Sequence, residues 1–192
     1  MDRNAAWALL NEYTQNQRLI GHGLAVEACM RHYARKFGED VETWGMIGLI
    51  HDFDYERWPT IPDHPLQGER ILAERGVPED IRYTILSHAS DYLDGKYPRK
   101  SLRDKVLFAV DELSGLVVAT ALVRPSKSIF EVDVEAVRKK MKDKRFAAGV
   151  KREDVIKGAE ELGMDLDEHI GEVIKALQEA ADTLGLRGTY QG

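Results

Sequence analysis

The residues of this chain best suited to chemistry are four histidines and the aspartate that follows one of them. His51 is followed directly by Asp52, and His22, His64 and His88 fall at or near the ends of segments with helical apolar spacing. Imidazole and carboxylate together suit zinc, manganese, iron, cobalt or nickel, and adjacent residues at a helix terminus can both turn toward one ion. The pattern favours a metal site, although a single histidine is more often a packing residue or a helix cap.

The order of these residues resembles the signature of a known family. His22, then His51-Asp52, then Asp111 on a later helical segment is similar to the H...HD...D signature of the HD superfamily, a set of all-helical metal-dependent phosphohydrolases. The resemblance covers roughly residues 20 to 120. It implies that His22, His51, Asp52 and Asp111 are metal ligands, with Asp52 and His51 as the catalytic residues.

A longer stretch resembles the six-ligand members of the superfamily, notably the HD-GYP group. The matching runs are HPLQGERIL at 64–72, ILSHAS at 85–90 and DGKYP at 94–98. By this resemblance His64 and His88 are two further ligands, and Asp52 bridges two divalent transition metal ions. The chain departs from that group at Ala89, where a second histidine is usual, and it looks closer to the short, stand-alone HDIG-type proteins of bacteria.

The implied activity is that of a metal-dependent phosphohydrolase acting on a small phosphate ester or nucleotide through a metal-bridged hydroxide. Two ions about 3.5 to 4 Å apart can acidify a shared water, orient a phosphoryl group and stabilise the leaving oxygen. The chain contains neither a GxSxG elbow nor a P-loop, so the metal route is the one available. Two alternatives stay open: a di-iron oxygenase of the same superfamily, and a non-catalytic metal or nucleotide-binding module.

An anionic substrate also needs cations from the protein. The segment ALVRPSKSI offers Arg124 and Lys127 just past the helical segment that bears Asp111, in a turn broken by Pro125. Arginine can hold a phosphate with a two-pronged hydrogen bond, and lysine can act as a point charge. We predict that Arg124 and Lys127 bind the substrate phosphate, with a plain helix-connecting turn as the equal alternative.

Several other groups are open to both a structural and a functional interpretation. The basic cluster at 138–152 is most simply a solvated helix face, with a rim that steers a polyanion as the alternative. Asp104 and Glu112 flank Asp111 and compete for its role, and the resemblance selects Asp111. The loop residues that are candidates for lining a pocket are Asp54, Tyr55, Tyr92 and Tyr97, and the tyrosines among them could equally be packing.

Helices must position these groups, because apolar residues recur at helical spacing along most of the chain. One such series is Val106, Val110, Leu113 and Val117, and no convincing alternating strand is present. Helix starts are expected at Asp63, Pro78, Ser101 and Asp165, and helix ends at Gly38, Gly76, Gly163 and Gly185. Two stretches, 53–62 and 91–100, interrupt the helical pattern and are expected to be loops.

These signals predict an all-α fold. We expect a single-domain helical bundle of about eight or nine helices, an HD-type domain that occupies residues 1–192. The metal-binding core is expected at about 20–120, with helices at about 132–186 that complete or cap it. A homodimer through one of these later helices stays open, although no sustained heptad pattern supports a coiled coil.

Composition limits the partners and the compartment. The formal net charge of -6 argues against nucleic-acid polymers and anionic membranes as general partners, because binding them needs an excess of Lys and Arg. A small phosphorylated substrate fits this net charge better than a nucleic-acid polymer or a membrane does. The lone cysteine, Cys29, cannot form an internal disulfide, and neither a leader pattern nor a long apolar run is present. We therefore expect a cytoplasmic protein.

Overall fold

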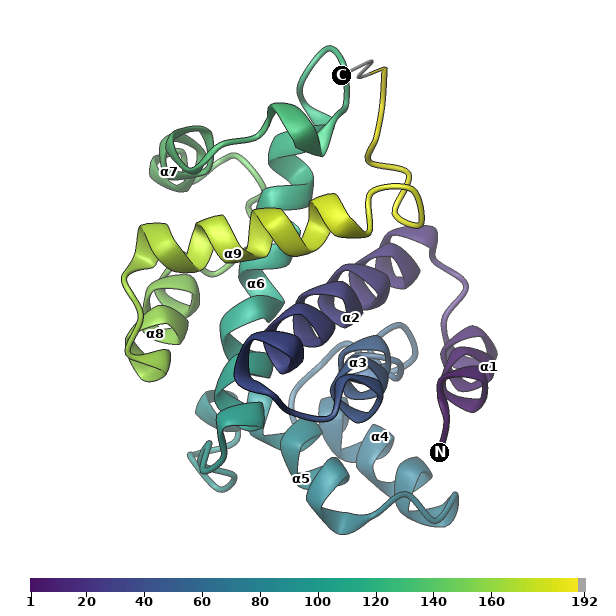
Figure 1. Cartoon of the computed structure of the whole chain (residues 1–192). Coiled ribbons are helices and arrows are strands. Elements are labelled where there is room, and N and C mark those ends of the chain that lie inside the picture. Colours follow the sequence, from purple (N-terminus) through teal and green to yellow (C-terminus); the bar gives the residue numbers. More distant parts are fainter. Residues whose placement is uncertain (190–192) are drawn as a thin grey trace. The chain divides into compact units, whose positions relative to one another are not determined.

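Helices make up all the regular structure of residues 1–189, the range that the computed structural model describes (Figure 1). Within that range there are nine α-helices, two short 3-10 helices and no strand, so the all-α prediction is confirmed. The α-helices are α1 (Arg3–Tyr13), α2 (Gln17–Phe37), α3 (Val41–Ile50), α4 (Asp63–Glu74), α5 (Glu79–His88), α6 (Leu102–Leu122), α7 (Val134–Lys142), α8 (Arg152–Leu162) and α9 (Leu166–Glu179). The 3-10 helices are η1 (Ser90–Tyr92) and η2 (Ile129–Glu131). None of the helices in residues 1–189 has the length and apolar character needed to cross a bilayer.

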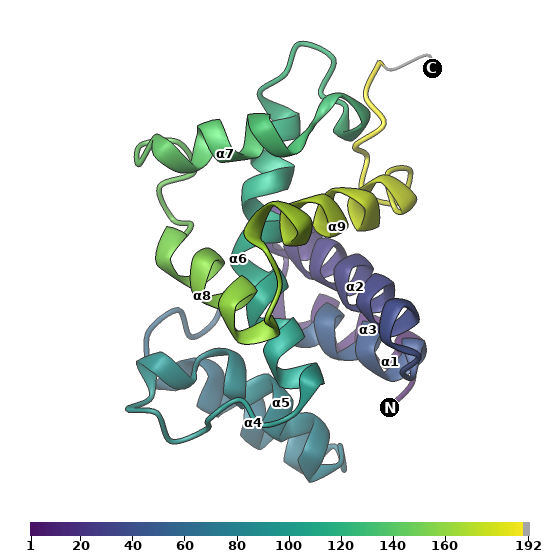
Figure 2. The ribbon, with the colours of Figure 1, turned by 60° about the vertical axis from the view of Figure 1, so that its left-hand side comes forward.

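The chain divides into two compact units inside α6. The first unit is Met1–Phe108, and the second begins at Ala109. In the first unit α3 contacts α1, α2 and α5, and α4 contacts α5 (Figure 1). In the second unit α9 contacts α7, α8 and η2 (Figure 2). The single-domain organisation expected from the sequence stays a prediction.

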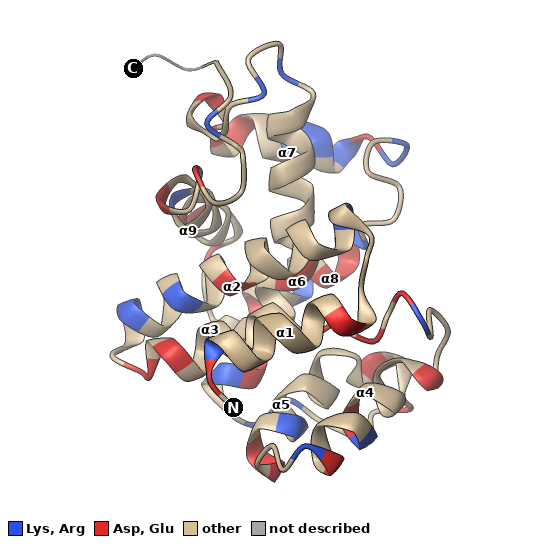
Figure 3. Cartoon of the chain, turned by 90° about the vertical axis from the view of Figure 1, so that its right-hand side faces the viewer, with Lys and Arg blue, Asp and Glu red and all other residues tan. Residues whose placement is uncertain are grey.

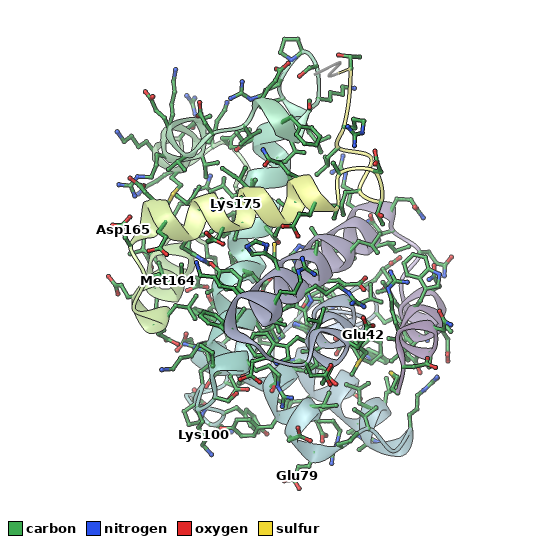
Figure 4. All side chains as sticks on the ribbon, viewed as in Figure 1. Glu42, Glu79, Lys100, Met164, Asp165 and Lys175 are labelled. Carbon is green, nitrogen blue, oxygen red and sulfur yellow. The ribbon has the colours of Figure 1, made fainter. Side chains whose placement is uncertain are left out.

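Short polar side chains and glycines set the helix ends, as the corner between α8 and α9 illustrates. Gly163 ends α8 with a φ of 65°, in the left-handed region that favours glycine. Only Met164 then separates it from Asp165, whose carboxylate accepts hydrogen bonds from the backbone N–H groups of Asp167 (2.9 Å) and Glu168 (3.2 Å) (Figure 4). The helix end and the helix start predicted here are both confirmed.

A buried carboxylate fastens the first three helices together. Glu27 of α2 is 5% exposed and accepts hydrogen bonds from the guanidinium of Arg3 in α1, at 2.7 and 2.9 Å. It also accepts one from Arg31 of its own helix at 3.0 Å, and Arg31 in turn donates to both oxygens of Glu42 in α3 (2.7 and 2.9 Å; Glu42 is labelled in Figure 4). Because charge-assisted hydrogen bonds are directional, this network holds α2 and α3 in a defined register.

Candidate metal centre

His51 and Asp52 directly follow the last residue of the buried helix α3. His51 is the residue that caps α3, and its side chain is fully buried. Its Nδ1 lies 2.8 Å from the carbonyl oxygen of Gly48, one turn earlier in the same helix. A carbonyl can only accept, so Nδ1 carries a hydrogen, and in the neutral ring the lone pair is therefore on Nε2. This Nε2 lies 3.5 Å from Oδ2 of Asp52, so the buried end of α3 presents an imidazole nitrogen beside a carboxylate.

His22 reaches the same carboxylate because α2 and α3 pack unusually closely. A Cβ atom on Gly23 would lie 2.8 Å from the carbonyl oxygen of Leu49, and one on Gly48 would lie 2.9 Å from the carbonyl oxygen of Val26. Only glycine allows such an approach of two helix backbones. The rings of His22 and His51 are consequently 5.0 Å apart between centroids, and Nε2 of His22 lies 3.9 Å from Oδ2 of Asp52.

His64 approaches Asp52 from the other side. It stands in the first turn of α4 with non-helical backbone angles (φ -79°, ψ 131°), and it precedes Pro65, which disfavours a helical conformation in the residue before it. The bent chain turns the mostly buried ring inward, so that Nε2 lies 3.3 Å from Oδ1 of Asp52.

His88 is the last residue of α5, and its ring is fixed in the same way as that of His51. Its Nδ1 donates to the carbonyl oxygen of Ile85, three residues earlier, so in the neutral ring the lone pair is on Nε2. This Nε2 lies 3.3 Å from Oδ1 of Asp52, and the rings of His64 and His88 are 5.4 Å apart. Four histidines from three helices and one helix cap thus surround one carboxylate.

Asp52 divides these histidines into two pairs, and the spacing fits metal ligands. Oδ2 faces His22 and His51, whereas Oδ1 faces His64 and His88. In each group the ligand atoms lie within 4.8 Å of one another. Two donors held about 2.1 Å from one ion at a tetrahedral angle are about 3.4 Å apart, close to the 3.3 to 3.9 Å found here. The residues of the first unit therefore fit a divalent ion on each side of Asp52.

The electrostatics of the cluster suit a cation. Burial raises the pKa of the Asp52 carboxyl, but His51 and the hydrogen-bonding groups of His64 and His88 hold that pKa well below its usual range. Burial lowers the pKa of His64, whereas its contacts with Asp52 and Asp54 raise it to about 10. Asp52 is therefore ionised at neutral pH, and an ion that binds His64 must displace a proton.

Comparison with known proteins identifies the family of the chain. A family model described as the HD domain matches residues 19–116, slightly more than half of the 192-residue chain. The chain belongs to the HD-domain family. The matched HD segment contains all six ligands predicted from the sequence, namely His22, His51, Asp52, His64, His88 and Asp111.

A curated protein is similar to part of the chain. Ribonuclease Y of Mycoplasma genitalium is 27% identical over 88 residues, which is 45% of this chain. The match spans 18% of ribonuclease Y, so this HD protein corresponds to less than a fifth of that relative's length. No solved structure matches the chain.

The carboxylates near Asp111 differ in their surroundings. Asp104 is buried, and it accepts hydrogen bonds from the Thr84 hydroxyl (2.7 Å) and from the backbone N–H groups of Lys100 (3.1 Å) and Ser101 (3.0 Å). Oδ2 thus caps the start of α6 and Oδ1 is taken by Thr84 of α5, which explains why Asp104 is a poor candidate for a ligand. Asp111 lies on α6 in the second unit, and its place among the ligands stays a prediction.

The predicted phosphate-binding residues lie beyond the end of α6. Arg124 is partly buried, and Lys127 is exposed with a φ of 52°. At about 1.5 Å per helical residue, the end of α6 at Leu122 stands about 17 Å from Asp111, and Arg124 follows two residues later. The substrate-binding role of Arg124 and Lys127 stays a prediction, and it requires a substrate long enough to cover that distance.

The basic cluster at 138–152 lies on α7 and the segment that follows it (Figure 3). Arg138 pairs with Asp167 of α9 at 3.3 Å. Arg152 donates to several backbone carbonyls of the segment before it, among them those of Ala147 and Val150, both at 2.6 Å. Arg152 therefore holds the segment before it, whereas Arg138 in its exposed ion pair and exposed lysines such as Lys139 fit the solvated face expected from the sequence.

Asp54 is a pocket-lining candidate by sequence, whereas the structure shows it in contact with a predicted metal ligand. It is 1% exposed, and its Oδ1 lies 2.8 Å from Nδ1 of His64. The neighbouring Tyr55 is 38% exposed and lies edge-on to the His64 ring, 5.2 Å away. The signal available in the sequence was a second acidic residue two positions after the His51-Asp52 pair.

Proposed function

We propose that this HD-domain protein is a metal-dependent phosphohydrolase that acts on a small phosphate ester or nucleotide at a two-ion centre. The observation that carries the proposal is the carboxylate of Asp52, each of whose oxygens faces the Nε2 atoms of two histidines. His22 and His51 would hold one ion with Asp52, and His64 and His88 the other. Asp111 is proposed as a further ligand of the first ion on the strength of the sequence signature.

The composition of the ligand set favours an anionic substrate. Imidazole ligands are neutral, so two divalent ions held by four histidines and two carboxylates keep a net charge of about +2. Such ions acidify water and stabilise charge on a phosphoryl oxygen. Asp52 is suited to bridging them, because its depressed pKa keeps both oxygens available as ligands at neutral pH. The name of the matched relative, a ribonuclease, is consistent with phosphoester chemistry in this family.

The proposal is tested by elemental analysis of protein purified without added metal, followed by a phosphatase screen with the ion found. We expect close to two ions per chain and phosphate release from at least one class of phosphate ester. Asp52→Ala should lose both ions and the activity. Asp63→Ala is the matched control, because Asp63 is an exposed carboxylate next to His64 in the chain that accepts a hydrogen bond from Gln67.

Other results would favour the alternatives. Consumption of oxygen by the iron-loaded protein, without phosphate release from any substrate, would identify an oxygenase. Retention of metal without either reaction would identify a binding module. Either result would overturn the hydrolase proposal.

A further inference from the structure

Asp54 is a buried carboxylate with both oxygens engaged. Oδ1 lies 2.8 Å from Nδ1 of His64, and Oδ2 accepts a hydrogen bond of 2.8 Å from the backbone N–H of Gly68 in α4. A Cβ atom on Gly68 would lie 2.8 Å from both Cγ and Oδ2 of Asp54, so α4 approaches the carboxylate at a position where a side chain has no room. Asp54 is therefore held in one orientation by contacts on both sides.

Asp54 gives Nδ1 of His64 a hydrogen-bond acceptor, as the helix backbone does for Nδ1 of two other histidines. Nδ1 of His51 and Nδ1 of His88 each donate to a carbonyl three residues earlier in their own helix. His64 stands at the start of α4, so it has no preceding turn of the same helix to supply such a carbonyl. The carboxylate of Asp54 takes that place, and Nε2 of His64 is thereby directed at Asp52.

We propose that Asp54 is the positioning residue of the second ion's site, because it selects the tautomer of His64 whose Nε2 binds the metal. The inference rests on the two-ion centre proposed above. A carboxylate that accepts from the far nitrogen of a ligand histidine also makes the imidazole a stronger donor to the metal. Among the three histidines whose Nδ1 contact is described above, His64 is the one that depends on a side chain, so a single substitution can weaken one ion site and spare the other.

The chemistry predicts what Asn would do at this position. An amide has one accepting oxygen and one donating NH2 group, whereas Asp54 accepts from two N–H groups. In Asp54→Asn the amide oxygen can keep the bond from Gly68, and its NH2 group then faces Nδ1 of His64. A metal binds only the neutral form of His64, and in that form the conflict would favour the hydrogen on Nε2, which removes the lone pair that the metal needs.

The test compares the wild type with Asp54→Asn and with the matched control Asp63→Asn, which removes the same charge from the exposed neighbour of His64. Zinc binding is followed by calorimetry and elemental analysis. We expect two ions in the wild type and in Asp63→Asn. In Asp54→Asn the second ion should bind about 10- to 100-fold more weakly, while the first is retained.

A second measurement needs no variant. In the zinc-loaded wild type, nitrogen NMR shifts of the His64 ring should show a hydrogen on Nδ1 and metal on Nε2, and metal on Nδ1 would overturn the inference. Unchanged affinity for two ions in a folded Asp54→Asn would overturn it as well. A wild type that binds one ion or none would instead remove the proposed two-ion centre, and the positioning role of Asp54 with it.

Discussion

Gly23 of α2 lies against the carbonyl oxygen of Leu49 in α3 so closely that a Cβ atom at Gly23 would be 2.8 Å from that oxygen. The contact involves backbone, which cannot move aside as a side chain can. It brings the residue before Gly23, His22, into range of the His51-Asp52 pair that follows Leu49 by two residues.

The first prediction follows from this contact. Gly23→Ala should force α2 and α3 apart and lower the free energy of unfolding by roughly 1–3 kcal/mol, with weaker metal binding at His22. The matched control is Gly21→Ala in the same helix, where a Cβ atom would meet nothing within 4 Å. That change should be neutral or stabilising by roughly 0.5–1 kcal/mol, since alanine favours helix. Urea unfolding of both variants measures the difference, and equal effects would contradict the role given to Gly23.

The division of ligands between the two oxygens of Asp52 makes a second prediction. His22→Gln should remove the ion on the Oδ2 side, and His88→Gln the ion on the Oδ1 side, so each variant should retain about one ion. His32→Gln serves as control, because the His32 ring packs edge-on against Tyr33 at 5.9 Å. Elemental analysis after dialysis checks the stoichiometry. Loss of both ions from either histidine variant would mean that the two sites are not separable.

A third prediction concerns pH and the second unit. His169 of α9 is fully buried, and its Nε2 lies 3.0 Å from the carbonyl oxygen of Ala109. Burial lowers its pKa below the usual value of about 6.5, although the bond to Ala109 opposes this. The unfolded chain then binds the proton more readily, so the stability from the neutral ring is present above pH 6.5 and is lost as the pH falls toward the lower folded pKa.

The measurement is the free energy of unfolding of the wild type and of His169→Gln at pH 7.5 and pH 5. Glutamine can still donate to Ala109 but does not titrate, so the wild type should lose more stability than the variant between the two values. The comparison with the variant is needed because burial raises the pKa of Glu112 to about 7, which gives a trend of opposite sign over the same range. The same pH dependence in both proteins would exclude His169 as its source.

The fourth prediction tests the substrate contact. Arg124→Ala should leave the metal content unchanged and raise KM roughly tenfold for an extended substrate such as a nucleoside polyphosphate. A small ester such as p-nitrophenyl phosphate should be unaffected, since Arg124 lies beyond the end of α6, which is itself about 17 Å from Asp111. Arg138→Ala, which removes an arginine paired with Asp167, is the control. Unchanged KM for every phosphate substrate would remove Arg124 from the site.

Much of the fold is local in origin, and the sequence was sufficient to predict it. Helical spacing of apolar residues, together with caps such as Asp165 and terminators such as Gly163, acts over a few residues. The order of His22, His51-Asp52 and the later histidines identified the family and the candidate ligands. The same pattern contained no information on which oxygen of Asp52 each histidine faces.

The orientation of the histidines around Asp52 was decided by contacts between residues far apart in the chain. The approach of Gly23 to Leu49 depends on two helices packing backbone to backbone, and neither helix shows this by its own periodicity. Asp54 reached His64 because the chain bends before Pro65 and because Gly68 leaves room for the carboxylate. Hydrogen bonds act over about 3 Å, so only the folded backbone determines which acceptor faces a given imidazole.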